Sequence, residues 1–555
     1  MKKQKFYQIL SNELSKKMSK NIFQSYKKQH TIATHYDAIC IGSGLGSLTT
    51  ASLLAKKGKR VLICEKHTTP GGFTHVFTRN DYEWDVGLHY VGDMDRKGSL
   101  LRVVFEHITD KNLKWADMGE VYDRVIIKDK CYEYVKGLQN WKARMKEYFP
   151  TEKDAKSIDK YVELLFAVNK SSKTFYTKKV LPEFMRMITA PFMSQEYEKF
   201  AQKTTKDVLD AISDNDDLKA VLSAQFGDYG MPPAQSSFVI HAAVALHYMN
   251  GGFYPVGGSE EIFNTIAPSI LNAGGDILIG AAVKEILIED GTAKGVIMQD
   301  GKIIKSDIVV SGAGVHITFK HLLPDSSKKK LKFYDEAMQM QPSFGHLSLY
   351  IGLKHTAEEL HLPKANYWIY PTGNNHDKAI ADFLADYNHE FPVVYISFPS
   401  SKNPTFLDKY PGRATIEIIT VAKYDWFKEW ENTRWKKRGE TYDSFKEKLA
   451  QRLLEHLYKY EPQLRGKIDV YELSTPITTK HFCNYLQGEI YGLDHPPERF
   501  KKDYLKPPTP IKNLFLTGQD IVTVGIGGAL MSGVLTASAI TKTNLIQEIV
   551  TATRS

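Results

Sequence analysis

A glycine turn between two apolar runs is the feature that most restricts how this chain can fold. Residues 36–41 form an apolar run, Gly42 to Ser47 read Gly-Ser-Gly-Leu-Gly-Ser, residues 48–57 have a helical pattern, and residues 60–64 form a second apolar run. Strand, glycine turn, helix and strand in this order begin a parallel sheet. The sequence therefore predicts a Rossmann-type α/β unit close to the N-terminus.

The glycine turn has the residues that a pyrophosphate requires. Gly42 allows the tight turn, Gly44 lets the backbone approach the phosphates, and the following helix aims its N-terminal N–H groups at their charge. Gly46 follows, and Ser47 stands where the usual pattern has a third glycine, although serine is small enough for close packing. Alone, such a pattern also fits a simple turn.

The residues after the second strand indicate which dinucleotide binds. Glu65 closes that strand, where a carboxylate accepts hydrogen bonds from an adenosine ribose, and Lys66 stands next to it. Gly71 and Gly72 form a pair that lets the chain pass tightly over a diphosphate, which a nicotinamide enzyme does not need. A solvated acid beside a lysine is the alternative interpretation of Glu65.

The C-terminal part of the chain supplies a second set of cofactor residues. Residues 513–517 predict a last buried strand, followed by Gly518 and Asp520, and then by Gly527 and Gly528 in an apolar helix. The N-terminus of that helix would face the pyrimidine edge of a flavin, and Asp520 would bond the ribityl chain or order a water on the diphosphate. We therefore expect noncovalent FAD, bound by both ends of the chain.

The pattern between these ends predicts an inserted domain. Short strands are predicted at residues 276–279, 282–289, 295–299, 303–310, 344–353 and 392–421, and helices dominate residues 100–250 and 424–462. We expect an α/β fold with a discontinuous Rossmann-type FAD-binding domain and an inserted mixed α+β substrate domain. The FAD-binding domain would comprise residues 34–110, 251–320 and 490–548, and the substrate domain residues 111–250 and 321–489.

The positive charge of the chain is concentrated in its first residues. The formal net charge is +9, and residues 1–30 hold eight lysines against one glutamate, so the body is close to neutral and a nucleic-acid partner is not expected. Apolar residues recur every fourth position opposite the lysines, at Leu10, Leu14, Met18, Ile22 and Tyr26. Residues 1–33 therefore predict a basic amphipathic leader on the cytoplasmic face of a membrane, and a leader packed on the protein or without structure is the alternative.

Cysteine usage and hydropathy restrict the compartment. The four cysteines include no CxxC pair, which favours a reducing compartment over a disulfide framework. No secretory signal or convincing membrane span is visible, and no His, Cys and Asp cluster has metal-ligand spacing. We expect a cytoplasmic protein, peripheral on a membrane, with no metal.

Six longer stretches carry a resemblance to a known family. They are YDAICIGSGLGSL, PGGFTHVF, WDVGLHYVGDM, HYMNGGFYPVGGSEEI, FPSSKNPTFLDKYPGR and NLFLTGQDIVTVGIGGALMSG. With them the chain resembles the retinol saturase branch of the phytoene desaturase and carotenoid isomerase family. The resemblance implies an amine-oxidase-like arrangement around one FAD and a tunnel for an apolar polyene or isoprenoid. It places Val283 where relatives hold the adenine, and Tyr254 near the tunnel.

The resemblance also implies a redox reaction at a C=C bond, in which reduced flavin gives a hydride and a second group gives a proton. His89, Tyr90 and Tyr254 are the candidate catalytic residues. The ordinary pKa of His89 allows either protonation state near neutrality, which suits a general acid. A histidine that bonds the backbone near the flavin, and tyrosines that only line the tunnel, are the alternatives.

Four other activities remain open on the same fold. A carotenoid isomerase or a phytoene-type desaturase would use the same FAD, an amine oxidase is a weaker possibility, and a prenyl-lipid escort of the GDI type would use no flavin. No second glycine fingerprint followed by an acid is present, so an external electron donor or acceptor is expected.

Overall fold

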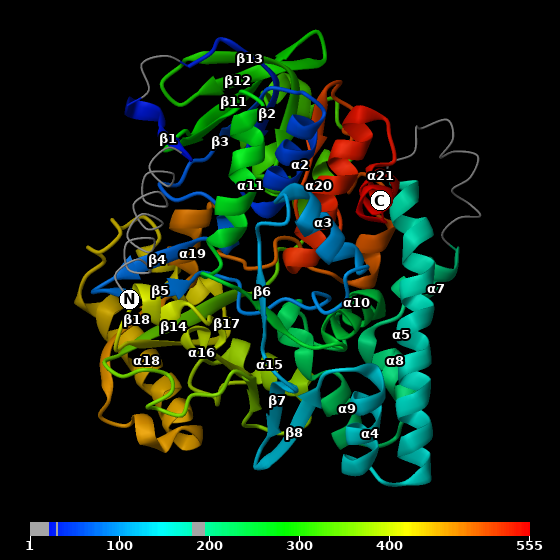
Figure 1. Ribbon diagram of the computed structural model, residues 1–555, viewed down its shortest axis with the longest axis vertical. Coiled ribbons are helices and arrows are strands. Elements are labelled where there is room, and N and C mark those ends of the chain that lie inside the picture. The colour runs from blue at the N-terminus through cyan, green and yellow to red at the C-terminus, as the bar shows by residue number, and fades with distance from the viewer. Residues whose placement is uncertain (1–21, 29–31, 180–194, 555) are drawn as a thin grey trace, which may run out of the picture.

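The computed structural model describes residues 22–28, 32–179 and 195–554 of the 555-residue chain. An eight-stranded sheet combines strands from distant parts of the sequence. In Figure 1 its blue and green strands lie side by side. Its order is β1 (Gln24–Ser25), β10 (Asp276–Ile279), β3 (Val61–Cys64), β2 (His35–Ile41), β13 (Ile303–Ser311), β12 (Thr292–Met298) and β11 (Val283–Glu289), with β19 (Leu514–Leu516) paired to β13.

The centre of this sheet is parallel and buried. Strands β2, β3, β10, β13 and β19 pair in parallel, whereas β11 and β12 are antiparallel additions at the edge. Helix α2 (Leu45–Lys56) packs between α11 (Glu261–Asn272) and α20 (Gly525–Thr541), and every residue from Leu45 to Ala55 is buried. These buried residues are apolar or have small hydroxyl side chains, which suits a helix buried on all sides. The predicted discontinuous α/β fold is confirmed.

A second, seven-stranded sheet forms the other half of the molecule. Its order is β18 (Ile468–Ser474), β14 (Gly345–Leu353), β17 (Ala414–Ala422), β16 (Val394–Ser397), β15 (Asn366–Tyr370), β7 (Val121–Ile127) and β8 (Lys130–Val135). All nine residues of β14 are buried, because it is a central strand with neighbours on both edges. Helix α18 (Glu440–Tyr460) contributes Leu453 and Leu457 to the same core.

The hairpin of β7 and β8 is an exception within residues 100–250, which are mainly helical as predicted. The apolar run Val121–Ile127 is rich in β-branched residues and ends at Lys128, which has a positive φ of 55° in the turn. Such a run before a tight turn is a strand signal that the overall helical pattern concealed. The remaining strands at residues 276–311 and the helix from Gly525 follow the prediction.

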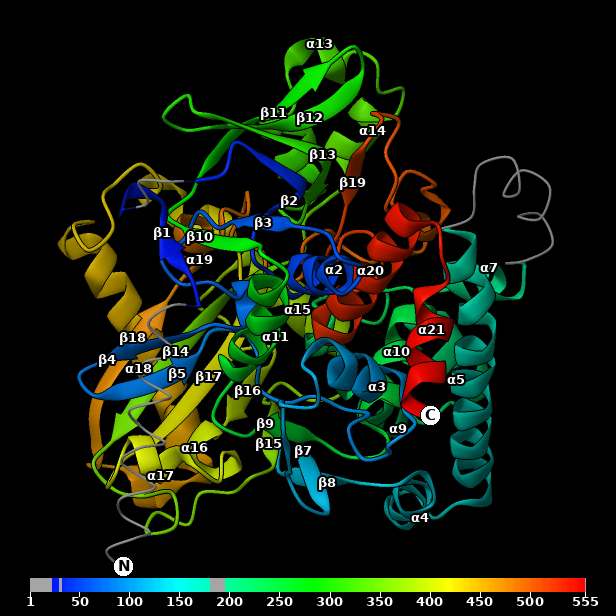
Figure 2. The ribbon, with the colours of Figure 1, turned by 45° about the horizontal axis from the view of Figure 1, so that its top comes forward.

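Helices cover one side of the molecule, as Figure 2 shows at the right of the view. They are α3 (Leu100–Ile108), α4 (Leu138–Tyr148), α5 (Glu152–Lys178), α7 (Gln195–Ala201), α8 (Thr205–Ile212), α9 (Asp216–Leu222), α10 (Phe238–Tyr248) and the C-terminal α21 (Leu545–Arg554). Helix α10 packs on α5, and α21 packs on α3. Tyr248 at the end of α10, and Asp228 at the end of a short helical turn after α9, line the cavities described below.

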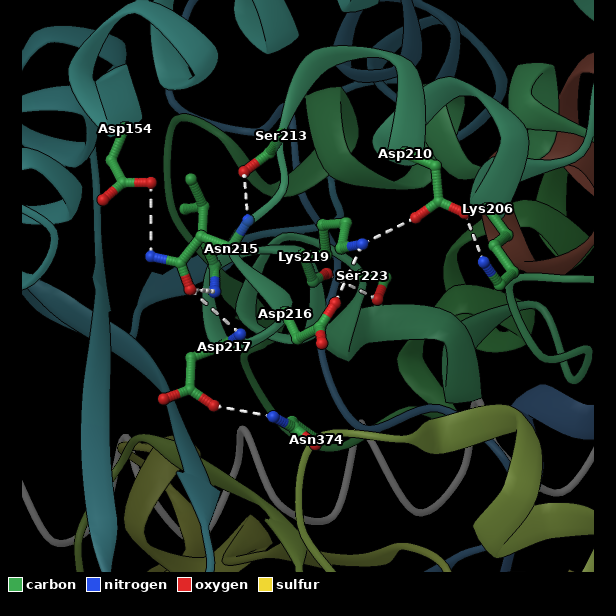
Figure 3. A network of polar contacts seen from close by, with 11 residues as sticks. Asp154, Lys206, Asp210, Ser213, Asn215, Asp216, Asp217, Lys219, Ser223 and Asn374 are labelled. Carbon is green, nitrogen blue, oxygen red and sulfur yellow. Dashed lines mark hydrogen bonds and ion pairs between the residues drawn. The ribbon is translucent and has the colours of Figure 1, made fainter. Parts of the chain in front are cut away.

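Charged side chains on α8 and α9 form a network that stabilises this helical region (Figure 3). Asn215 caps α9 by accepting hydrogen bonds from the backbone N–H groups of Asp217 and Leu218, at 3.1 and 3.2 Å. The ammonium of Lys219 lies 2.7 Å from a carboxylate oxygen of Asp210 and 2.9 Å from one of Asp216. Solvent-exposed pairs of this kind contribute little each, and the network lies outside both cavities.

The described end of the leader is part of the body of the protein. Gln24 and Ser25 form β1 at the edge of the eight-stranded sheet, the ring of Phe23 lies 6.1 Å from that of Phe263, and the Tyr26 hydroxyl donates to Asp300 at 2.9 Å. The predicted helix is therefore wrong for residues 22–28, where pairing with β10 satisfies the backbone. Residues 1–21, with most of the amphipathic pattern, lie outside the described residues. Among the described helices none is long and apolar enough to cross a bilayer.

Candidate cofactor and substrate site

One cavity lies at the carboxyl ends of β2 and β3 and extends to His89, Tyr90 and Asp228. The predicted cofactor residues that line it are Gly42, Gly44, Gly46, Ser47, Glu65, Lys66, Gly71, Gly72, Val283 and Gly518. His89, Tyr90, Asp228 and Tyr248 line its far end. Ligands of open α/β sheets bind at the carboxyl ends of the strands, so the position of this cavity is the one that the fold predicts.

Three glycine segments cross in this cavity where no side chain fits. Gly72 has a φ of 59°, and a Cβ on it would lie 2.9 Å from the Cα of Gly44. A Cβ on Gly46 would lie 2.8 Å from the backbone nitrogen of Gly518. Nothing lies within 4 Å of the Cβ position of Gly44, at the N-terminus of α2. The result is an open backbone surface with helical N–H groups, which fits a dinucleotide pyrophosphate.

Glu65 fixes the shape of the turn that carries these glycines. One carboxylate oxygen accepts hydrogen bonds from the backbone N–H of Ser43 at 2.9 Å and from its hydroxyl at 2.6 Å, and the other accepts from the N–H of His67 at 2.7 Å. The ammonium of Lys66 donates to the side chain of Asn484 at 2.8 Å. Carboxylate oxygens have several lone pairs, so Glu65 can still accept bonds from a ribose.

The C-terminal residues are arranged differently from the prediction. Asp520 does not line the cavity, because its oxygens accept hydrogen bonds from the N–H groups of Val315 at 2.8 Å and Leu493 at 3.0 Å. Gly527 and Gly528 lie in α20 behind the wall, and a Cβ on Gly528 would lie 1.8 Å from the carbonyl oxygen of Thr523. Besides Gly518, the residues of this segment that line the cavity are Gln519, Gly525, Ile526 and Ala529.

A second cavity adjoins the first and lies on the seven-stranded sheet. The two share the wall residues Gly87, His89, Asp228, Ile490 and Tyr491. The rest of the second cavity is mostly apolar and aromatic, with Gly227, Gly230, Phe344, Gly345, His346, Trp368, Val393, Tyr395, Ile419, Thr420 and Val421. An apolar cavity with a few polar groups is typical of a small-molecule site.

Several polar atoms of this second cavity are buried without a hydrogen bond to any described residue. They are Nδ1 of His346, Nε1 of Trp368 and the hydroxyl of Tyr395, together with both ring nitrogens of His89. These side chains are largely buried, so the protein carries the desolvation cost of each group. Such groups are available to bond a ligand or an ordered water.

His89 lies between the cavities, as its candidate role requires, but its protonation state differs from the prediction. Its Nδ1 lies 2.8 Å from a carboxylate oxygen of Glu417, without the alignment of a hydrogen bond. Burial, and then the nearby charge of Lys402, lower the pKa of His89 to about 3. The imidazole is therefore neutral at physiological pH, whereas the prediction from its ordinary pKa allowed either state.

The two candidate tyrosines occupy different places. The Tyr90 hydroxyl lies 3.0 Å from Oδ2 of Asp123 and 2.9 Å from Oδ2 of Asp228, and its ring stacks on Tyr248 with centroids 4.0 Å apart. The Tyr254 hydroxyl donates to Asp85 at 2.5 Å, and Tyr254 lines neither cavity. The structure thus brings together His89 and Tyr90 but not Tyr254.

A cluster of buried ionisable residues lies behind these side chains, and the sequence interpretation missed it. Burial raises the pKa of Asp85 and Asp123 to about 7 and that of Glu417 to about 8, and it lowers the pKa of Lys402 to about 7. Burial also raises the pKa of Asp228 well above its ordinary value. An acid within the apolar run Ala414–Ala422 was the one local signal, because strands seldom bury a lone glutamate.

Metal chemistry has no visible support in the described part of the chain. No group of three or more His, Cys, Asp and Glu side chains in residues 22–28, 32–179 and 195–554 is placed to hold an ion. Cys40 and Cys64 are buried free thiols, as expected.

Comparison with known proteins gives the same picture of the fold. Residues 40–106 match the family of NAD(P)-binding Rossmann-like domains. The structure of putrescine oxidase bound to putrescine superposes with a TM-score of 0.59 at 14% identity, over 92% of this chain and 99% of that one. At that identity the likeness establishes the fold alone.

Full-length relatives are much more similar in sequence. The chain is 35% identical to all-trans-retinol 13,14-reductase of Homo sapiens over 98% of this chain and 90% of that protein. It is also 35% identical to all-trans-retinol 13,14-reductase of Danio rerio, over 92% and 86% of the two chains. Chloroplastic prolycopene isomerase 1 of an Oncidium hybrid cultivar is 26% identical over 90% and 83%.

Proposed function

This chain belongs to the all-trans-retinol 13,14-reductase family of oxidoreductases, and on that premise we propose that it binds FAD and saturates a C=C bond of a polyene lipid, such as a retinoid or a carotenoid. The observation that carries the proposal is the pair of adjoining cavities. One has the glycine cradle of a dinucleotide site, and the other is an apolar space on the seven-stranded sheet, with His89 and Asp228 in the wall that they share.

The residues of the first cavity fit noncovalent FAD. Gly42 to Ser47 and the N-terminus of α2 would hold the diphosphate, Glu65 the adenosine ribose, and Val283 the adenine. The N-terminal turn of α20, with Gly525 and Ile526 in the wall, would face the flavin pyrimidine. Bound and reduced, FAD supplies a hydride to one carbon of the double bond.

The residues of the second cavity would orient the polyene and exclude water. Val393, Ile419 and Val421 offer an apolar surface from adjacent strands, where a conjugated chain can lie without losing hydrogen bonds. The second carbon of the double bond needs a proton, and a positioned acid can accelerate that step. The titratable side chains that both cavities share are His89, Asp228 and Tyr491, and Tyr90 lines the first cavity beside them.

The direct test is a single turnover. The FAD-loaded protein is photoreduced without oxygen and mixed with retinol or with a carotenoid, and the products are weighed by mass spectrometry. We expect a product two mass units heavier, formed as the flavin reoxidises. An isobaric product with the flavin still reduced would contradict saturation and support a cis–trans isomerase, the second candidate, which the likeness to prolycopene isomerase favours.

FAD binding is tested on its own. We expect the purified protein to carry stoichiometric flavin, which Glu65→Ala weakens by about 1.5–3 kcal/mol through loss of charged hydrogen bonds. Titration of the apoprotein with FAD, followed by flavin fluorescence, measures this difference. A protein without flavin that gains none from added FAD would contradict the redox proposal and revive a lipid escort.

We also propose that residues 1–21 bring the protein to the cytoplasmic surface of an anionic membrane, where a water-insoluble polyene can be collected. The support is the row of apolar residues opposite lysines in the sequence. Sedimentation with anionic vesicles, with and without residues 1–21, is the test, and equal pelleting would contradict it. The reducing equivalents would come from an external donor.

A further inference from the structure

We propose that Asp228 is the acid that protonates the polyene. Tyr90 and Asp123 hold its carboxyl group in place and assist its reprotonation. This inference rests on the proposed saturation of a C=C bond. It assigns the proton donor to a residue that no sequence motif indicated, and it gives Tyr90 a role behind the donor instead of as the donor.

The first step is the position of the carboxyl group. Asp228 ends the short helix η3 (Ala224–Asp228) and lines both cavities, so its side chain borders the space for the cofactor and the space for the polyene. Its one hydrogen-bond partner given by the structure is the Tyr90 hydroxyl, at 2.9 Å. A group that bridges the two cavities is within reach of the double bond that the hydride attacks.

The second step is the charge of Asp123. In its protonated form Lys402 only donates, and its contact with Oδ1 of Asn366 then fixes that amide so that Nδ2 donates to Asp123 at 2.9 Å. Nε2 of Gln225 donates to the other oxygen of Asp123, also at 2.9 Å. With two amide donors and the charge of Lys402 nearby, Asp123 is the member of the cluster best able to carry the negative charge.

The third step is a count of protons. The Tyr90 hydroxyl has a single proton, yet it lies within hydrogen-bond distance of a carboxylate oxygen of Asp123 and of one of Asp228. When Tyr90 donates to the ionised Asp123, its contact with Asp228 requires that Asp228 be protonated and donate to the tyrosine oxygen. The chain of donors therefore runs from Asp228 to Tyr90 to Asp123.

The surroundings support this order. The groups around the triad are the rings of Tyr248, Tyr395 and Tyr491 and the ammonium of Lys402, and burial together with Asp123 raises the pKa of Asp228. Two carboxylates on either side of one phenol would repel each other at low dielectric, so one of them keeps its proton. His89 is neutral, and a neutral imidazole is a weaker acid than a carboxylic acid.

The proposed step is balanced as follows. The O–H bond of Asp228 breaks and a C–H bond forms at the carbon that does not receive the hydride, and the electron pair of the broken bond stays on Asp228. The reduced flavin of the proposed function is the reductant. The Tyr90 hydroxyl then turns from Asp123 to the new carboxylate, and a proton from solvent restores the triad.

The kinetic experiment compares four full-length, FAD-loaded proteins after photoreduction without oxygen: the wild type, Asp228→Asn, Asp228→Glu and the control Tyr161→Phe. Tyr161 is a buried tyrosine whose hydroxyl bonds His241 outside both cavities. We expect Asp228→Asn to slow flavin reoxidation by a polyene about 10²–10⁴-fold with FAD retained. Asp228→Glu should recover part of the rate, and Tyr161→Phe should match the wild type.

Two further readouts separate chemistry from structure. In D₂O the wild type should place deuterium on one face of the product, whereas slow product from Asp228→Asn should carry it on both faces. Infrared spectra of the resting proteins should contain a protonated-carboxyl C=O band that Asp228→Asn lacks and Tyr90→Phe shifts. The band needs no turnover.

The outcomes are distinguishable. A wild type that forms only isobaric product contradicts the reduction and the relay together. A wild type that reduces the polyene while Asp228→Asn keeps its rate and stereochemistry contradicts only the assignment of Asp228. The band of buried Glu417 is expected in both proteins, so the assignment is overturned if the carboxyl bands of the wild type and of Asp228→Asn are the same, with none lost.

Discussion

The two cavities differ in how far their buried polar groups are hydrogen-bonded. At the cofactor end, Glu65 and Asp520 are carboxylates whose oxygens accept backbone N–H groups, and glycines bring the backbone close without side chains. At the substrate end, His89, Trp368 and Tyr395 have buried polar atoms without a described partner. In the first region the carboxylates are satisfied before any ligand binds, although the Ser47 hydroxyl there is also buried without a described partner. The second region has several such groups, at a cost in stability.

The difference reflects two kinds of task. A dinucleotide is held by a rigid surface, and every group that fixes that surface adds to affinity by reducing the ordering needed on binding. A reaction needs groups whose protonation differs from that in water, and burial supplies this shift at functional sites. Satisfied groups should therefore cost stability when removed, and unsatisfied groups should not.

The largest effect is expected at the crossing of the glycine segments. Gly72→Ala should destabilise the protein by about 2–5 kcal/mol, the sum of left-handed backbone strain and a clash with Gly44. The measurements are the free energy of unfolding by denaturant and the amount of flavin that the purified variant retains. Gly58→Ala is the matched control, since Gly58 also has a positive φ but open space around its Cβ position, and should cost only about 1–2 kcal/mol. Equal losses would show that the crossing is not tightly packed.

Asp520→Asn tests whether the cofactor end depends on a carboxylate that binds two backbone N–H groups. The amide cannot accept at both positions, so one of the N–H groups of Val315 and Leu493 loses its partner, at a cost of about 1.5–3 kcal/mol. The free energy of unfolding and the affinity for FAD should both fall. Asp335→Asn, an exposed carboxylate on α14 (Tyr334–Gln339), is the control and should change neither. A normal FAD affinity would mean that this carboxylate holds no part of the cofactor site.

The buried ionisable groups at the substrate end should make the free energy of unfolding depend on pH. Glu417 has a folded pKa of about 8 against an ordinary 4.5, so the folded protein binds the extra proton between these values and loses stability as pH rises. One full proton corresponds to about 1.4 kcal/mol per pH unit. His89, whose pKa falls from 6.5 to about 3, acts in the opposite direction below pH 6.5, where its stabilising effect is lost as pH falls.

Glu417→Gln should therefore flatten the decline in unfolding free energy between pH 6.5 and 8, a window above the His89 transition. Denaturant unfolding at several pH values in that window measures it. A decline as steep as that of the wild type would remove Glu417 as the source and leave the other buried acids, among them Asp85, Asp123 and Asp228.

The smallest effects are expected from two tyrosines, with opposite signs. Tyr395→Phe removes a buried hydroxyl that has no described partner and should raise the free energy of unfolding by about 1 kcal/mol. Tyr161→Phe removes a hydroxyl 2.7 Å from Nε2 of His241 and should lower it by about 1 kcal/mol. Equal losses from both variants would mean that an ordered water already satisfies Tyr395.

Much of the fold could be predicted because its signals are local. The turn Gly42–Ser47, the acid at Glu65 and the strands at residues 276–311 each follow from spacing within one segment. The β7 and β8 hairpin and the pairing of Gln24 and Ser25 with β10 could not be predicted in this way. A two-residue edge strand is defined by its partner, which lies about 250 residues away in the sequence.

The candidate site also has one part with local sequence signals and one part that depends on distant residues. The sequence by itself determined the glycine turn and Glu65 at the cofactor end, because glycines at a fixed spacing specify the backbone shape that suits a pyrophosphate. It did not determine the arrangement of Asp520, Gly527 and Gly528. Only the tertiary structure decided the reacting end. Asp123, Asp228, Lys402 and Glu417 come from four separate segments, and their protonation depends on burial and on one another. That is also why the sequence could point to His89 but not to its protonation state, since its ordinary pKa is a property of the residue and its lowered pKa is a property of the fold.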